Sequence, residues 1–178
     1  EPRLFDNYTY VMCTDGELME GITFEACSFA ATQKLGKLIV FYDQNKISID
    51  GSTDITFTED IAKRYEAYGW QVLKGDMYNV KGILKLVEKA KKCTDKPTLI
   101  MLKSVIGKYA PNQGTSAVHG EPLGDEKVAA TKKNLGLNPE EFFYVDPDAL
   151  RYFNEKKEEF ESLQKNWKEE FAAWEKEN

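Results

Sequence analysis

Residues 36–51 read GKLIVFYDQNKISIDG, and this stretch decides the fold class. Its first half predicts a strand at residues 37–42, in which residues 38–42 form a nearly continuous apolar run, typical of a parallel sheet that helices cover on both faces. Similar runs occur at residues 8–13, 70–73 and 98–105. Its second half is polar, and in an open parallel sheet ligands bind beyond the carboxyl ends of the strands. Residues 43–51 are therefore candidates for a site.

Helical patterns separate these strands, and each is bounded by a residue that commonly starts or ends a helix. The expected helices are 17–35 ending at Gly36, 59–68 between Thr58 and Gly69, and a segment through residue 92 that Asn79 caps. Strand thus alternates with helix through short connections. This alternation predicts an α/β fold, an open parallel sheet flanked by helices with right-handed crossovers.

The last thirty or so residues have a different pattern. From Asp148 onward aromatic residues recur at seven-residue spacing, namely Phe153, Phe160, Trp167 and Trp174. The pattern predicts one long C-terminal amphipathic helix whose aromatic stripe packs on the domain or on another chain. We therefore expect an α/β domain at residues 1–146, incomplete at its amino end, and a helical region at residues 147–178.

The bulk composition excludes several classes of partner. The 178 residues include 30 acidic and 24 basic side chains, a formal charge of −6, and no basic cluster interleaved with aromatic residues, so nucleic acid is not expected. Three widely spaced cysteines match no disulfide or metal pattern and predict a reduced, cytoplasmic setting. No apolar run approaches the ~18 residues that span a bilayer, so no membrane partner is expected. A start without Met suggests an excised fragment.

Polar residues follow the first two predicted strands. Thr14-Asp15-Gly16 follows the first, and Asn45-Lys46-Ile47 comes shortly after the second. A carboxylate, an amide oxygen and a backbone carbonyl suit Mg²⁺, and a glycine lets the backbone approach a phosphate. Two other nucleotide motifs fail, because Lys-Ser/Thr is missing after the P-loop-like spacing from Gly16 to Gly21, and no G-x-G-x-x-G occurs.

The Asp15-Gly16 pair, with Asn45 thirty residues further on, resembles the thiamine diphosphate motif of Gly-Asp-Gly and a later Asn. Several strings resemble the transketolase family in order and spacing. They are DGELMEG (15–21), GKLIVFYDQNKISIDG (36–51), FTEDIAKRYEAYGW (57–70), DKPTLI (95–100) and VHGEPLG (118–124). The likeness covers residues 8–137 and favours transketolase over the related deoxyxylulose phosphate synthase and E1 decarboxylase families. It implies a thiamine-diphosphate-binding fold, partial in this chain.

The resemblance also implies roles for individual residues. Asp15, Asn45 and the backbone carbonyl of Ile47 would bind Mg²⁺ or Ca²⁺; Gly16, Asn45, Ile49, Ile106 and His119 would contact the cofactor. His119, the only histidine, would be the catalytic residue and would face the donor substrate. Two positions depart from the family pattern: Thr14 stands where the motif has glycine, and Ser116 where many relatives have another histidine. A β-branched Thr14 would disfavour a turn that needs positive φ.

By the same resemblance, the expected reaction is transfer of a two-carbon ketol unit between sugar phosphates. Thiamine diphosphate carries that chemistry, and the protein orients it. A glutamate needed for activation belongs to a pyrimidine-binding domain or subunit that no segment here resembles, so the chain alone should be inactive and a homodimer is expected. The alternative is an isolated or degenerate domain that folds and self-associates through its apolar stripe without binding cofactor.

Overall fold

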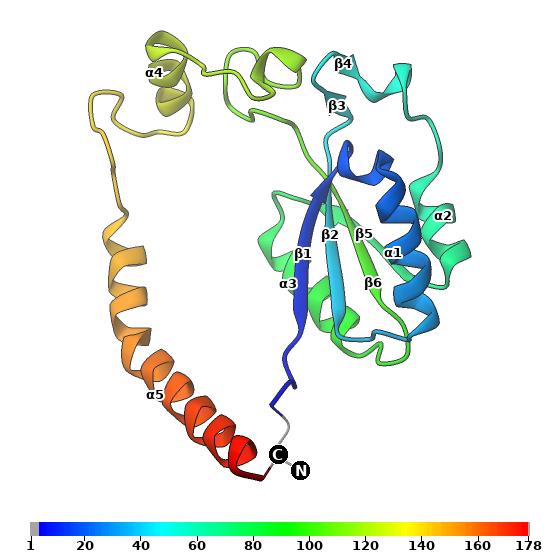
Figure 1. Ribbon diagram of the computed structural model, residues 1–178. Coiled ribbons are helices and arrows are strands. Elements are labelled where there is room, and N and C mark those ends of the chain that lie inside the picture. The colour runs from blue at the N-terminus through cyan, green and yellow to red at the C-terminus, as the bar shows by residue number, and fades with distance from the viewer. Residues whose placement is uncertain (1–3, 178) are drawn as a thin grey trace. The chain divides into compact units, whose positions relative to one another are not determined.

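A computed structural model describes residues 4–177, and their contacts group into two compact units. The larger unit, Tyr8–Pro139, contains a four-stranded, all-parallel sheet with the strand order β1-β2-β6-β5 (Figure 1). Its strands are β1 (Thr9–Thr14), β2 (Leu38–Gln44), β5 (Gln71–Asp76) and β6 (Thr98–Lys103). The predicted parallel α/β fold is confirmed.

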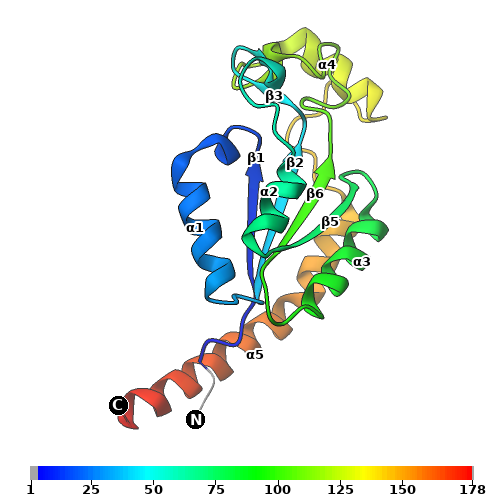
Figure 2. The same cartoon turned by 90° about the vertical axis from the view of Figure 1, so that its right-hand side faces the viewer.

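Helices cover both faces of this sheet. Helices α1 and α2 lie on one face and α3 on the other, as the two perpendicular views show (Figures 1 and 2). The helices of this unit are α1 (Gly21–Thr32), α2 (Ile61–Tyr68), α3 (Val80–Lys91) and α4 (Asp125–Asn134). Shorter elements are the 3-10 turns η1 (Glu17–Met19), η2 (Thr53–Ile55) and η3 (Ser116–Val118) and the two-residue strands β3 (Ile47–Ser48) and β4 (Gly51–Ser52).

The apolar run in β2 follows from this layering. Successive side chains of a strand point to opposite faces of the sheet. Val40 and Tyr42 therefore pack in the core under α1 and α2, whereas Ile39 and Phe41 pack in the core under α3. Because both faces are buried, no polar side chain interrupts the strand until Asp43, at its carboxyl end.

The ends of α2 and α3 test the predicted caps. Gly69 has φ 97° at the end of α2, and the Asn79 side chain accepts a hydrogen bond from the Gly82 amide at the start of α3, so both of these caps are confirmed. The prediction of Thr58 as the N-cap of α2 is wrong. Asp60 takes that role, because its carboxylate accepts the Lys63 amide at 3.2 Å.

Helix α1 is shorter than predicted at both ends. The 3-10 turn η1 precedes it, and it ends at Thr32, after which Lys34 adopts φ 53°. Gly36 is therefore not the cap. Close packing requires glycine at this position, because a Cβ here would overlap the backbone of Thr94.

The second unit consists of residues 4–7 with residues 140–177, and its main element is α5 (Pro147–Glu177). The predicted long C-terminal helix is confirmed. Its aromatic row remains substantially exposed, from 63% at Phe153 to 39% at Trp174, while the Trp167 indole donates to the Leu4 carbonyl at 3.4 Å. The division of the chain into domains at residues 146/147 stays a prediction. Of the helices within residues 4–177, none combines the length and apolar character that crossing a membrane requires.

Candidate functional site

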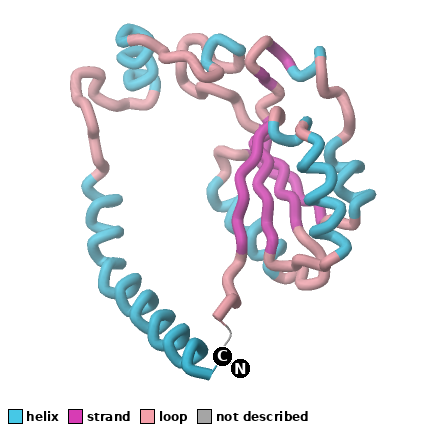
Figure 3. The backbone as a smooth tube through the Cα atoms, in the orientation of Figure 1, coloured by secondary structure: helices cyan, strands magenta, loops and turns pink. Residues whose placement is uncertain are grey.

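The carboxyl ends of β1 and β2 bring the two predicted ligand segments together. The strands are hydrogen-bonded neighbours, with Thr14 opposite Asp43, so the residues that follow them leave the sheet side by side. Figure 3 shows the strands ending at this edge, where loops replace them. The open parallel sheet with polar strand ends defines the class of α/β domains that bind ligands in this position.

Asp15 is the centre of this group. Its side chain is only 2% exposed, and three donors surround its carboxylate. Oδ1 accepts the Tyr42 hydroxyl at 2.5 Å, and Oδ2 accepts the backbone amides of Asn45 at 3.2 Å and Lys46 at 2.8 Å. A buried carboxylate is stable only when it is paired or well hydrogen-bonded, so these donors hold Asp15 against the Asn45 loop.

The loop itself is strained where it meets Asp15. Lys46 has φ 61°, a conformation that costs a non-glycine residue roughly 1–3 kcal/mol. The strain is held by contacts on both sides, because the Lys46 carbonyl accepts the Thr53 amide at 3.0 Å and the Asn45 side-chain oxygen accepts the Ile47 amide at 3.0 Å. Asp15, Asn45 and Ile47 therefore form one hydrogen-bonded group, and strain of this kind is common at functional sites.

Gly16 has no conformational need to be glycine. Its φ of −62° and ψ of −43° are right-handed helical values, and no atom lies within 4 Å of an ideal Cβ built there. A missing Cβ leaves open space on the solvent side of the turn, next to Asp15. A group as bulky as a phosphate would fit against such a backbone.

Thr14 does not strain the turn. Thr14 is not among the non-glycine residues with positive φ within residues 4–177. The position where the family motif has glycine therefore needs no left-handed backbone in this chain. Glu17 secures it instead, since its Oε2 accepts the Thr14 amide at 2.6 Å and the Thr14 hydroxyl at 3.2 Å.

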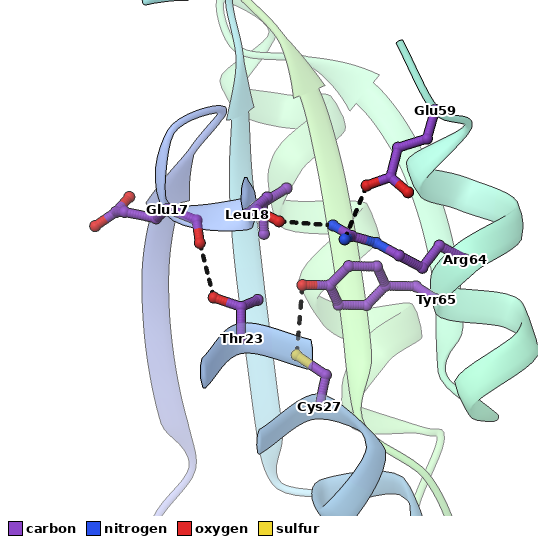
Figure 4. A network of polar contacts seen from close by, with 7 residues as sticks. All are labelled: Glu17, Leu18, Thr23, Cys27, Glu59, Arg64 and Tyr65. Carbon is purple, nitrogen blue, oxygen red and sulfur yellow. Dashed lines mark hydrogen bonds and ion pairs between the residues drawn. The ribbon is translucent and has the colours of Figure 1, made fainter. Parts of the chain in front are cut away.

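Arg64 fastens the segment after Gly16 to the core. Figure 4 shows its guanidinium reaching from α2 to the Leu18 carbonyl, 2.9 Å away, and to the carboxylate of Glu59, 2.8 Å away. Its side chain is only 20% exposed and lies over the ring of Phe57. The Thr23 hydroxyl donates to the Glu17 carbonyl at 2.7 Å and holds the same turn from α1.

Burial also shapes the chemistry of two groups beside Asp15. Desolvation, together with the hydrogen bond to Asp15, raises the pKa of Tyr42 far above its usual value, so the hydroxyl remains a donor. Desolvation, helped by Glu17, raises the pKa of the Cys13 thiol to about 12. Cys13 is therefore an inert core thiol rather than a nucleophile.

The remaining predicted residues lie on other segments of the chain. Ile49, 71% exposed, follows β3 in a small hairpin, while Ile106 and His119 share the loop after β6. That loop is closed by a hydrogen bond from the Gly114 amide to the Ile106 carbonyl at 2.8 Å. No hydrogen bond within the described part of the chain joins His119 to Asp15, so the role of the histidine stays a prediction.

Sequence reasoning missed Tyr42, Lys46 and Arg64. Tyr42 is one apolar residue of a strand in the sequence, and nothing there shows that its hydroxyl meets Asp15, 27 residues away. Arg64 falls inside one of the family-like strings, but its partner Leu18 is 46 residues away. The strained φ of Lys46 has no sequence signal.

Two cavities differ in their relation to this site. A polar cavity of about 150 Å³ adjoins Asp15 and is also lined by Tyr42, Gln44 and Thr53. A larger one, about 530 Å³, lies at the amino ends of the strands, against Tyr8 and residues 34–38. The larger cavity is remote from the strand tips, where ligands of this fold bind. The smaller one lies at the strand tips beside Asp15, although Gly16, Asn45 and Ile47 are not among its lining residues. No three His, Cys, Asp or Glu side chains cluster within residues 4–177, and the predicted ion set contains only one carboxylate.

Known proteins resemble this chain along its whole length. The family described as "Transketolase, thiamine diphosphate binding domain" matches residues 1–178. A transketolase of Treponema pallidum is 51% identical over 98% of this chain, and one of Nostoc is 44% identical over 98%. The chain spans 26% of the length of each of these relatives.

Solved structures agree with the sequence comparison. A mutant transketolase of Pichia stipitis in complex with xylulose-5-phosphate superposes with a TM-score of 0.90 at 43% identity, over 99% of this chain and 26% of its own. The transketolase of Leishmania mexicana gives 0.89 at 40% identity, over 97% and 26%. The chain belongs to the transketolase family and corresponds to its thiamine diphosphate binding domain. The predicted family and the predicted thiamine diphosphate are confirmed.

Proposed function

We propose that this chain is the part of a transketolase that anchors a divalent cation and the diphosphate of thiamine diphosphate. In the assembled enzyme it takes part in transfer of a two-carbon ketol unit between sugar phosphates. The observation that carries the proposal is the buried Asp15 carboxylate, hydrogen-bonded to the loop that holds Asn45 and Ile47, beside a glycine whose open side faces solvent.

The donor set suits a hard cation. Asp15 would supply a carboxylate oxygen, Asn45 its amide oxygen and Ile47 its backbone carbonyl, and Mg²⁺ or Ca²⁺ binds oxygen ligands of these kinds. Asp15 and Asn45 already touch through the 3.2 Å hydrogen bond between the Asn45 amide and Asp15 Oδ2. With only one protein carboxylate, the divalent cation keeps a net positive charge that a diphosphate can neutralise. This is usual for Mg²⁺ sites that share a substrate phosphate.

The other predicted residues complete the proposal. Gly16 would lie against the diphosphate, Ile49 and Ile106 would pack near the cofactor rings, and His119 would donate a hydrogen bond to the diphosphate and face the substrate. When bound, thiamine diphosphate supplies the carbanion chemistry of the transfer, and the chain supplies orientation and electrostatics. Transketolases of Pichia stipitis have been crystallised with xylulose-5-phosphate and sedoheptulose-7-phosphate, which supports sugar phosphates as the substrates.

The chain matches only about a quarter of its relatives' length, 26%, so catalysis would need further parts. These are a pyrimidine-binding domain or subunit and a second copy in a homodimer. The conformation of Thr14 removes one reason to favour a degenerate domain, because the turn needs no glycine there.

Gly16 offers a test in which stability and binding change in opposite directions. Gly16→Ala should leave the unfolding free energy unchanged or raise it by about 0.4–1 kcal/mol, because the backbone is already right-handed. The added methyl group would occupy the space of the diphosphate, so the affinity for thiamine diphosphate with Mg²⁺ should fall at least tenfold, about 1.4 kcal/mol. Calorimetric titration and urea unfolding measure the two effects.

Gly21→Ala is the matched control, since Gly21 also lacks positive φ and has no atom near an added Cβ. It should bind like the unaltered chain. Binding weaker than about 1 mM by the unaltered chain, near −4 kcal/mol, would favour the alternative of a domain that folds without cofactor. Equal binding by both alanine variants would remove Gly16 from the diphosphate site.

A further inference from the structure

Tyr42 and Asp15 form a buried pair at the end of the sheet. Tyr42 lies near the carboxyl end of β2 and is 1% exposed, and Asp15 follows β1 and is 2% exposed. The tyrosine hydroxyl donates to Asp15 Oδ1 at 2.5 Å, a short bond of the kind that a neutral donor makes to a charged oxygen. The pair joins the two strands through their side chains as well as through the sheet.

The contacts of Asp15 leave little of its carboxylate free. An ionised carboxylate has two oxygens with about two acceptor positions each. The amides of Asn45 and Lys46 both donate to Oδ2, at 3.2 and 2.8 Å, and so use both of its positions. Tyr42 uses one position of Oδ1, so one acceptor position remains.

We propose that Tyr42 is a positioning residue that turns the Asp15 carboxylate so that Oδ1 alone faces the cation. This inference rests on the function proposed above and deepens it. Asp15 is then a ligand through a single oxygen, and its orientation about the Cβ–Cγ bond is fixed by a phenol hydroxyl on one side and two backbone amides on the other. Tyr42 touches neither cation nor cofactor.

Positioning should matter more for Mg²⁺ than for Ca²⁺. Mg²⁺ requires near-octahedral geometry at short distances, whereas Ca²⁺ accepts longer and more variable oxygen contacts. Without Tyr42, the carboxylate can rotate and Oδ1 gains a second open position. Residues that hold a metal ligand in place commonly affect metal affinity by about 10–100-fold when changed.

Tyr65 provides a matched control. Like Tyr42, it is 1% exposed and lies in the core under α1 and α2, and burial raises its pKa as it raises that of Tyr42. Its hydroxyl accepts a hydrogen bond from the Cys27 thiol at 3.4 Å (Figure 4), whereas the hydroxyl that Asp15 accepts is that of Tyr42. Tyr42→Phe and Tyr65→Phe thus remove the same atom from equally buried rings.

The experiment titrates Mg²⁺ and, separately, Ca²⁺ into the 178-residue chain with saturating thiamine diphosphate, and reads the heat of binding. Tyr42→Phe should weaken Mg²⁺ binding about 10–100-fold and Ca²⁺ binding about threefold or less, and a higher Mg²⁺ concentration should restore cofactor binding. Tyr65→Phe should leave both affinities unchanged. Urea unfolding of both variants shows whether they remain folded to the same extent.

Three results would overturn the inference in distinguishable ways. If the unaltered chain shows no cation-dependent binding, the proposed function fails and the inference fails with it. If the unaltered chain binds and Tyr42→Phe matches Tyr65→Phe, only the inference fails. Equal losses for Mg²⁺ and Ca²⁺ in Tyr42→Phe would indicate a general loss of structure and also overturn it.

Discussion

The two regions proposed to meet the cofactor are built in different ways. The Asp15 turn, residues 14–17, is held by side chains from two other elements, Tyr42 of β2 and Thr23 of α1, and Asp15 is only 2% exposed. Arg64 of α2 holds the adjoining Leu18 carbonyl. The His119 loop, residues 104–120, is anchored where it leaves β6, by Ser104 donating to Asp43 and by the Val105 amide donating to the Tyr78 hydroxyl at 2.8 Å. Beyond that point its hydrogen bonds are mostly local turns.

This difference indicates a division of roles. A group fixed by buried contacts binds in a preset orientation, and changing it affects folding as well as binding. A half-exposed side chain on a loop of local turns can be changed with little effect on folding, because few buried contacts depend on it. Substitutions should therefore couple stability to cofactor binding at the Asp15 turn and separate them at the His119 loop.

The largest effect is expected for Asp15→Ala. The substitution leaves the Tyr42 hydroxyl and the amides of Asn45 and Lys46 without their acceptor in a buried place. Each unsatisfied buried donor costs about 1–3 kcal/mol, so the unfolding free energy should fall by about 3 kcal/mol or more. Cation-dependent binding of thiamine diphosphate should be lost. Urea unfolding and calorimetry measure the two losses.

Asp50→Ala is the control for this change. Asp50 is an exposed residue in the turn between β3 and β4, so its loss removes the same charge at the surface. It should leave both stability and binding nearly unchanged. A stable Asp15→Ala chain that still binds the cofactor with Mg²⁺ would show that the two regions do not differ as described.

The second effect concerns Arg64, which tests whether the Asp15 turn depends on contacts outside the strand ends. Arg64→Met keeps most of the apolar side chain but removes the bonds to the Leu18 carbonyl and to Glu59. Loss of charged hydrogen bonds of this kind costs about 1.5–3 kcal/mol. We expect a drop of that size in the unfolding free energy, and severalfold weaker cofactor binding through the loosened turn.

Lys63→Met is the neighbouring control. The Lys63 side chain is 80% exposed and pairs with Asp60 at 3.5 Å, an exposed pair of a kind that contributes little. Its stability and its cofactor affinity should match those of the unaltered chain. If Arg64→Met behaves in the same way, the network of Figure 4 does not support the turn.

The fold could be predicted from the sequence because burial on two faces has a clear signature. Strands β2 and β6 contain continuous apolar runs, residues 38–42 and 99–102, and Asn79 and Gly69 mark helix ends by well-known chemistry. Elements with weak patterns were missed. The helix α4 has no buried residue, and the strands β3 and β4 have two residues each, so neither leaves a periodic apolar pattern.

The site could be predicted only as far as neighbouring strand ends. Parallel pairing of β1 with β2 places Asp15 beside the Asn45 loop. The alternation of strands with helices along the sequence indicates such parallel pairing. The contacts that orient Asp15 depend on the strand order in the sheet. They also depend on the position along the neighbouring strand from which a side chain reaches Asp15. The contacts of Tyr42 and Arg64 therefore cannot be predicted from the sequence, because a long-range side-chain contact follows no fixed sequence spacing.

The smallest effect on folding is expected for His119→Ala, at the other end of the comparison. His119 follows η3 with an extended backbone, and its imidazole makes no hydrogen bond within residues 4–177. The unfolding free energy should therefore change by no more than about 0.5 kcal/mol. Because the imidazole is proposed to donate to the diphosphate, cofactor affinity should fall about tenfold, as expected for one hydrogen bond to a charged group.

Gln113→Ala provides the opposite change in the same loop. Its side-chain oxygen accepts a hydrogen bond from the Tyr109 amide at 2.8 Å, and Tyr109 has φ 72°. Loss of this local bond should lower the unfolding free energy by about 0.5–1.5 kcal/mol. The pair then separates two roles within one segment. His119→Ala should lower binding without lowering stability, and Gln113→Ala should lower stability with a smaller effect on binding. If His119→Ala instead destabilises the chain and leaves cofactor affinity intact, the histidine is a structural part of the loop, and the contact with the diphosphate must come from another residue.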